Sequence, residues 1–148
     1  STEFMARERL ASDREAFGRF LSQIEEASMS KEDRELIDLY VVERLAWESI
    51  AERLGTTVGA ARVAMKRLRD RLLPRIFEPI RRRLAVDDWT IAEALFVRRL
   101  TAEKAAESLG VGPDVLRRIA VDRIVPQVIA EWGGESTELV LRLTGHRR

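Results

Sequence analysis

The chain has 148 residues, the size of one ordinary domain or of two very small ones. Hydrophobic residues make up 45% of it, enough for a core, and 34% charged with 6% aromatic residues favours solvated helices over a sheet-rich fold. Cysteine is absent and His146 is the single histidine, which excludes disulfides, thiolate catalysis and cysteine-based zinc sites. We therefore expect no cofactor and no metal.

No apolar run approaches the roughly 20 residues of a membrane-spanning helix, and no apolar signal-peptide segment follows the start. These features predict a cytoplasmic protein without a membrane partner. Residues 1–4, Ser-Thr-Glu-Phe before Met5, resemble the remnant of an expression tag, so the prediction leaves them out.

The net charge of +1 hides an uneven distribution. Residues 1–43 carry a net charge of −5, residues 44–83 carry +7, and residues 84–148 carry −1. A localised positive segment of this kind is typical of a surface that binds a polyanion. The alternative is that the arginines only solvate one face of a helix.

Two helices are predicted ahead of this positive segment. Apolar residues at helical spacing, with a mostly acidic opposite face, predict a packing helix over residues 5–27. Ser30 followed by Asp33 has the pattern of a helix N-cap, and a second helix is expected from there to about Arg44.

Residues 45–73 hold the central motif, two helices joined by a short turn. Gly55 can take the left-handed conformation that ends the first helix and starts the turn at Thr56 and Thr57. A short helix, a glycine-containing turn and a longer basic helix are typical of a helix-turn-helix. Apolar residues at helical spacing should form the buried faces: Trp47, Ile50, Ala51 and Leu54, then Ala61, Met65, Leu68 and Leu72. Trp47 is interpreted as core, with ligand binding as the lesser alternative.

The opposite face of the second motif helix is the expected contact surface. Arg62 has the donors for a bidentate contact with guanine, whereas Lys66, Arg67 and Arg69 suit phosphates. Gly59 lowers helix propensity by roughly 1 kcal/mol, and close approach to a groove floor would explain it. The same face has the apolar residues Val58, Ala60 and Val63, so we expect phosphate contacts to dominate and specificity to be modest.

Pro74 and Pro79 predict a kink or a short connector over residues 74–86, because each proline removes a helix donor. Arg81, Arg82 and Arg83 follow within this segment. They either extend the phosphate-binding strip or solvate a linker helix, and the sequence leaves both readings open.

A shift of 55 residues aligns the first copy of the motif, residues 30–73, with a second copy at residues 87–131. The offset later falls to 52, so the second copy lacks about one helical turn. Its second helix is expected to begin with Gly112 as cap and Pro113 at the first position. Asp114 and Asp122 accompany its arginines, which favours a structural or partner-binding role. Identical pairs at the two offsets include Asp33/Asp88, Arg44/Arg99, Glu48/Glu103, Ala51/Ala106, Leu54/Leu109, Gly55/Gly110, Arg62/Arg117, Arg71/Arg123 and Pro74/Pro126.

These patterns together predict an all-α fold with two tandem helix-turn-helix helical bundles. The expected segments are 1–29, a tag remnant and packing helix; 30–73, the first copy; 74–86, a basic connector; 87–131, the degenerate second copy; and 132–148. The last segment should hold a short helix that packs back or pairs with another subunit, which leaves a homodimer open, and then a disordered tail over residues 145–148.

Residues 30–73 resemble the fourth conserved region of bacterial sigma factors, and residues 87–129 resemble it more weakly. The resemblance is carried by the acidic helix start, the sequence Trp-Glu-Ser-Ile-Ala at 47–51, Leu54-Gly55 and the glycine-containing basic helix. It implies a module whose second motif helix enters the major groove of promoter DNA and whose other surface docks on RNA polymerase. The residues it places against DNA are Thr57, Val58, Ala60, Arg62, Val63, Lys66 and Arg67.

The leading hypothesis is a transcriptional regulator that binds double-stranded DNA. The alternative is a sigma-like interaction module that binds RNA polymerase or another regulator without reading DNA. An enzyme is not expected, because Glu48 and Glu52 are only nominal catalytic candidates and are better explained as solvated side chains. The predicted DNA-binding residues are Thr57, Val58, Gly59, Ala60, Arg62, Val63, Lys66, Arg67, Arg69, Arg81, Arg82 and Arg83.

Overall fold

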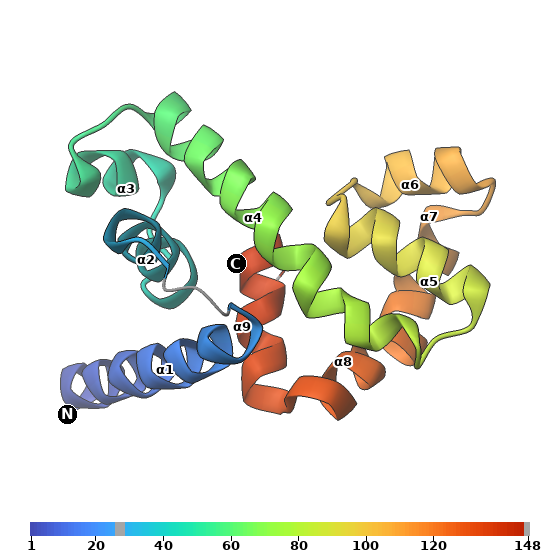
Figure 1. Ribbon diagram of the computed structural model, residues 1–148, viewed down its shortest axis with the longest axis horizontal. Helices are drawn as coiled ribbons and strands as arrows, with labels where there is room; N and C mark the ends of the chain where they lie inside the picture. Colours follow the sequence, from blue (N-terminus) through green and yellow to red (C-terminus); the bar gives the residue numbers. More distant parts are fainter. Residues whose placement is uncertain (26–28, 147–148) are drawn as a thin grey trace. The chain divides into compact units, whose positions relative to one another are not determined.

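The computed structural model describes residues 1–25 and 29–146, and every regular element in these two ranges is a helix (Figure 1). No strand occurs there, so the all-α prediction is confirmed. Within the same residues, no helix combines the length and the apolar character that crossing a membrane requires.

Residue contacts divide the chain into two units. Unit 1 consists of residues 1–69 and 138–148, and unit 2 consists of residues 70–137. Both boundaries fall inside helices, the first in α4 (Val58–Arg81) and the second in α9 (Gly134–Thr144).

Unit 1 begins with α1 (Thr2–Ile24), whose first turn is capped by the Ser1 hydroxyl, which accepts a hydrogen bond from the Phe4 amide at 3.1 Å. The helix therefore includes residues 2–4, which the sequence analysis leaves out. Its predicted last residues, 26 and 27, lie outside the described part of the chain. Phe17, Phe20 and Leu21 are buried, so one face of the helix packs as its spacing predicts.

The next helical stretch is α2 (Lys31–Ile37), which continues without a break into the π-helix η1 (Asp38–Val42). The predicted N-cap is confirmed, because the Ser30 hydroxyl accepts a hydrogen bond from the Asp33 amide at 3.1 Å. The stretch ends at Arg44, whose φ of 56° reverses the chain. The Leu45 amide then donates to the Leu39 carbonyl at 3.1 Å and closes the end of the helix.

The central motif follows, with α3 (Trp47–Leu54) joined to α4 by a turn of three residues. Gly55 has a φ of 65°, so its predicted left-handed conformation is confirmed. Ile50 and Ala51 of α3 and Ala61, Met65 and Leu68 of α4 are buried, which gives both helices the inner faces that the spacing predicts.

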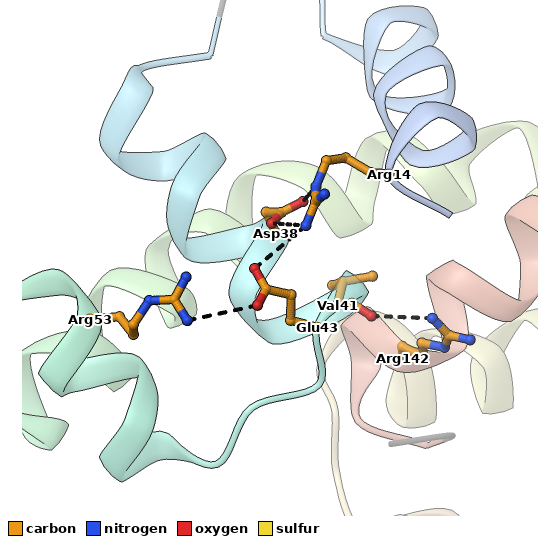
Figure 2. Close-up of polar contacts among 6 residues, drawn as sticks. All are labelled: Arg14, Asp38, Val41, Glu43, Arg53 and Arg142. Carbon is orange, nitrogen blue, oxygen red and sulfur yellow. Dashed lines mark hydrogen bonds and ion pairs between the residues drawn. The ribbon is translucent and has the colours of Figure 1, made fainter. Parts of the chain in front are cut away.

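Ion pairs connect the helices of unit 1 around η1 (Figure 2). Arg14 of α1 makes two hydrogen bonds to Asp38, at 2.8 and 3.2 Å, and these raise the pKa of its guanidinium. Glu43 accepts Arg14 at 3.5 Å and Arg53 of α3 at 3.8 Å. The pairs are partly exposed, so they define geometry more than they add stability.

The end of α9 belongs to unit 1. Leu139, Val140 and Leu143 are buried, and Arg142 is only 5% exposed. Arg142 donates to the Asp13 carboxylate at 3.0 Å and to the Val41 carbonyl at 3.3 Å (Figure 2). The C-terminal helix thus packs back onto its own chain, in contact with α1 and η1. The predicted disordered tail is described as far as His146, whose amide donates to the Leu141 carbonyl at 2.8 Å, and residues 147–148 lie outside the described part.

Unit 2 contains the second part of α4, which does not end at the prolines. The helix runs through Pro74 and Pro79 to Arg81, so the break expected in the connector is absent. A proline inside a helix costs about 3 kcal/mol. Leu72, Leu73, Ile76, Phe77 and Ile80 are fully buried on the same helix, and each such side chain contributes about 1.5–3 kcal/mol. Burial of this face therefore outweighs the loss from the prolines.

Three further elements of unit 2 repeat those of unit 1 at a constant offset. α5 (Val86–Ala92), the π-helix η2 (Glu93–Val97) and α6 (Ala102–Leu109) each begin and end 55 residues after α2, η1 and α3. The turns repeat as well, because Arg99 has a φ of 56° like Arg44, and Gly110 has a φ of 70° where Gly55 has 65°. The offset found in the sequence is therefore also an offset in backbone conformation.

The repeat ends after Gly110. α7 (Pro113–Ile119) starts with Gly112 as cap and Pro113 in its first turn, as predicted. It continues into the π-helix η3 (Ala120–Ile124) and α8 (Val125–Trp132), whereas the corresponding helix α4 is regular. The π-helical segment η3 thus lies where the sequence offset changes from 55 to 52.

Candidate nucleic-acid interface

The first turns of α4 in unit 1 present one continuous exposed surface, which we call the α4 outer face. Ala61, Met65 and Leu68 anchor the helix on its opposite side. No aspartate or glutamate occurs between Glu52 and Asp70, so the face carries only positive charge. Its residues are Thr57, Val58, Gly59, Ala60, Arg62, Val63, Lys66 and Arg67; all of them are exposed except Val58, which is half-buried.

The turn before α4 determines how this face begins. The Thr57 hydroxyl accepts a hydrogen bond from the Ala60 amide at 3.1 Å, and the Thr57 carbonyl accepts one from the Ala61 amide at 3.0 Å. Thr57 therefore acts as an N-cap and fixes the first turn of the helix.

Gly59 is the second residue of α4, and a Cβ atom added there would have no neighbour within 4 Å. Nothing in the protein itself therefore requires a glycine at this position. The absence of a side chain leaves the backbone of the first turn open to close approach from outside.

Arg62 projects from the α4 outer face but is held by an aromatic ring. Its guanidinium carbon lies 5.8 Å from the centroid of the Trp47 ring. Trp47, which the sequence places in the core, is half-buried, and its ring centroid lies 5.1 Å from that of Tyr40. Within the described residues Arg62 has no ion pair, so its N–H groups point to no carboxylate.

Arg69 differs from the other predicted DNA-binding residues because it is only 6% exposed. Its guanidinium carbon lies 4.6 Å from the Tyr40 ring centroid, and its Nε donates to the Leu143 carbonyl at 2.8 Å. Seven residues separate Arg62 from Arg69, which is close to two helical turns, so the two arginines follow one edge of α4. This spacing opposite two aromatic residues was a signal in the sequence that the sequence analysis missed.

The second copy holds its equivalent arginine in a different way. Arg117, 55 residues after Arg62, donates to Glu103 at 2.6 Å and to Asp114 at 3.1 Å. A hydrogen bond from its own backbone amide, then the one from Arg117, lowers the pKa of the Glu103 carboxyl. Asp114 stands where Gly59 stands in the first copy, and Ala102 where Trp47 stands. The same residue is thus neutralised by carboxylates in one copy and stacked on a ring in the other.

The three arginines that follow Pro79 belong to unit 2. The guanidinium carbon of Arg81 lies 5.5 Å from the Trp89 ring centroid, and Arg83 forms an ion pair with Glu131 at 2.9 Å. Arg82 is exposed and, among the described residues, has no ion pair. Two of the three therefore have partners inside their own unit, which favours the reading that they solvate and fix the end of α4.

A cleft of about 400 Å³ in unit 2 is the main concave feature near the second copy. Asp88 and Arg123 at its edge form an ion pair at 3.1 Å, so their charges compensate each other. In the described parts of the chain, no three carboxylate or histidine side chains group together as a metal site would require. Apolar side chains cover the rest of the cleft, namely Ile91, Leu109, Val111 and Ile119.

The α4 outer face is therefore the surface whose chemistry is least compensated within its own unit. It combines exposed cations, a capped first turn and small residues. Comparison of the chain with protein-family models, with curated proteins and with solved structures finds no match.

Proposed function

We propose that this protein is a transcriptional regulator that binds double-stranded DNA through the α4 outer face. The observation that carries the proposal is the exposure of Arg62, Lys66 and Arg67 on a helix face that lacks carboxylates. In this proposal α3, the turn at Gly55 and the start of α4 form a helix-turn-helix, similar to that of sigma factor region four. The start of α4 then enters the major groove.

Each part of the face has a distinct role in this arrangement. Lys66 and Arg67 contact phosphates and determine the register of the protein on the duplex. Arg62 reaches a base edge, where a guanidinium can bind guanine in a bidentate manner. Gly59 and Ala60 let the first turn approach the groove floor closely. Val63, which is 51% exposed, contacts thymine methyl groups.

The second copy is, in this proposal, a tandem helix-turn-helix that has lost DNA binding. The pairing of Arg117 with Glu103 and Asp114 supports this division of labour, since phosphates would have to displace two carboxylates. Its role is then structural or partner-binding, and RNA polymerase is the partner that the sigma-like pattern suggests.

The salt dependence of binding tests the proposal. Each phosphate contact contributes about −0.9 to the slope of log K against log salt concentration. Replacing Lys66 and Arg67 by alanine should make the slope of binding to a 20-bp duplex less negative by about 1.8. The matched control replaces Lys104 and Arg118 of the second copy, which are also exposed. The proposal fails if the two double variants change the slope equally, or if neither changes it.

The second candidate function is a sigma-like interaction module that binds RNA polymerase or another regulator without DNA. Exposed apolar side chains favour it: Val63 in unit 1, and Val115 and Val121 in unit 2, at 47% and 63% exposure. Under this alternative, purified RNA polymerase would retain the protein on a column while no duplex binding is detected at low salt.

A further inference from the structure

Four side chains of unit 1 form an alternating stack of cations and rings, which we call the cation–aromatic stack. Arg69 lies 4.6 Å from Tyr40, Tyr40 lies 5.1 Å from Trp47, and Arg62 lies 5.8 Å from Trp47, measured to ring centroids. The stack runs from a buried arginine to an exposed one, and its rings come from η1 and α3 while both arginines come from α4.

The inner end of the stack is well fixed. Tyr40 is 5% exposed and Arg69 is 6% exposed, and the Arg69 Nε donates to the Leu143 carbonyl of α9 at 2.8 Å. Tyr40 therefore has little freedom to move, and its ring supports one side of the half-buried Trp47. The two rings meet at an angle of 39°, within the range of favourable tilted aromatic contacts.

The outer end of the stack leaves Arg62 able to bind. A ring attracts a guanidinium through its π face and accepts none of the N–H groups in the guanidinium plane. A carboxylate partner would occupy those N–H groups, as Glu103 and Asp114 do with Arg117. An arginine on a ring thus loses side-chain freedom while it keeps the donors that a guanine or a phosphate needs.

We propose that Trp47, supported by Tyr40, is a positioning residue that pre-orients Arg62 for the duplex. This inference rests on the proposed DNA-binding function and names the device that makes one copy competent. The second copy lacks the device, because Ala102 and Leu95 stand 55 residues after Trp47 and Tyr40. Divergence of the two copies then follows from how each holds the same arginine.

A double-mutant cycle on Trp47 and Arg62 tests the inference, with fluorescence anisotropy of a random-sequence 20-bp duplex as the measurement. Arg62→Ala should weaken binding about tenfold, the size expected for hydrogen bonds to a charged group. Trp47→Leu should weaken it about two- to fivefold, the range of an exposed cation–π contact. Trp47→Phe keeps a ring and should remain within about twofold of the unmodified protein.

The decisive arm combines the substitutions. In an Arg62→Ala background, Trp47→Leu should have no further effect on affinity, because the residue acts only through Arg62. Equal losses from Trp47→Leu with and without Arg62 would overturn the inference and show a merely structural role, while DNA binding itself would stand. If the unmodified protein fails to bind any duplex at low salt, the proposed function falls and the inference falls with it. Thermal unfolding of each variant identifies those that lose affinity by losing the fold.

Discussion

Arg142 donates a hydrogen bond to the Asp13 carboxylate at 3.0 Å, across 129 positions of the chain. Both side chains are mostly buried, at 6% and 18% exposure, so the pair is shielded from water. The contact joins the last helix to the first and makes the C-terminal segment part of the unit that carries the α4 outer face.

Removing one partner of this pair should destabilise unit 1. Asp13→Ala leaves the Arg142 charge uncompensated in the interior, and breaking a buried pair in this way lowers the free energy of unfolding by about 3–5 kcal/mol. The exposure of Asp13 places the expectation at the lower end of that range. Urea denaturation measures the change. Replacing both residues, as Asp13→Ala with Arg142→Met, should recover part of the loss, whereas additive losses would contradict a direct interaction.

Relief of backbone strain at Arg44 should have the opposite effect. A non-glycine residue in the left-handed region costs about 1–2 kcal/mol, and Arg44 and Arg99 both have a φ of 56°. Arg44→Gly and Arg99→Gly should each raise the free energy of unfolding by about 1 kcal/mol, read from thermal or urea unfolding. Arg98→Gly is the matched control, since Arg98 has a φ of −85° and gains nothing from glycine. Strain is not the reason for the effect if Arg98→Gly stabilises the protein equally.

The Glu103 carboxyl should titrate below its ordinary pKa in the folded protein. A group whose folded pKa is lowered adds stability above its unfolded pKa, and this stability disappears as the pH falls through the folded pKa. Acid titration followed by NMR of the side-chain carboxyl measures the shift. Arg117→Gln should reduce the shift without abolishing it, because the hydrogen bond from the backbone amide is the larger cause. A Glu103 pKa that is indifferent to Arg117→Gln would show that the ion pair is absent in solution.

Much of the fold follows from local signals in the sequence. The Ser30 cap, the left-handed Gly55 and the Pro113 helix start depend on residues within one turn, and all three predictions are confirmed. The passage of α4 through Pro74 could not be predicted in this way, since it depends on apolar residues that tertiary packing buries.

The candidate site shows the same division between local and distant causes. Helical periodicity places Arg62, Lys66 and Arg67 on an exposed face, and the structure agrees. Periodicity does not reveal that Arg69 turns inward, because the Tyr40 ring and the Leu143 carbonyl come from distant parts of the chain. The equality of Arg62 and Arg117 in the alignment likewise conceals their different partners.

Gly59 offers a test that separates stability from binding. Gly59→Ala should raise the free energy of unfolding by about 0.5–1 kcal/mol, because alanine is the better helix former and the added methyl meets no atom. It should also weaken duplex binding, since the methyl group would keep the first turn of α4 away from the groove. Gly18→Ala in α1 is the control that should stabilise the protein without affecting binding. Unchanged affinity for Gly59→Ala would exclude close approach at this turn.

The most direct measurement of the central claim compares two charge reversals of equal size. One variant replaces Arg62, Lys66 and Arg67 by glutamate; the other replaces Arg98, Lys104 and Arg118, which are exposed in unit 2. Anisotropy titration of a 20-bp duplex at low salt should show more than a hundredfold loss for the first variant and less than about a threefold loss for the second. Equal affinities for the two variants, with both still folded, would contradict the assignment of DNA binding to the α4 outer face.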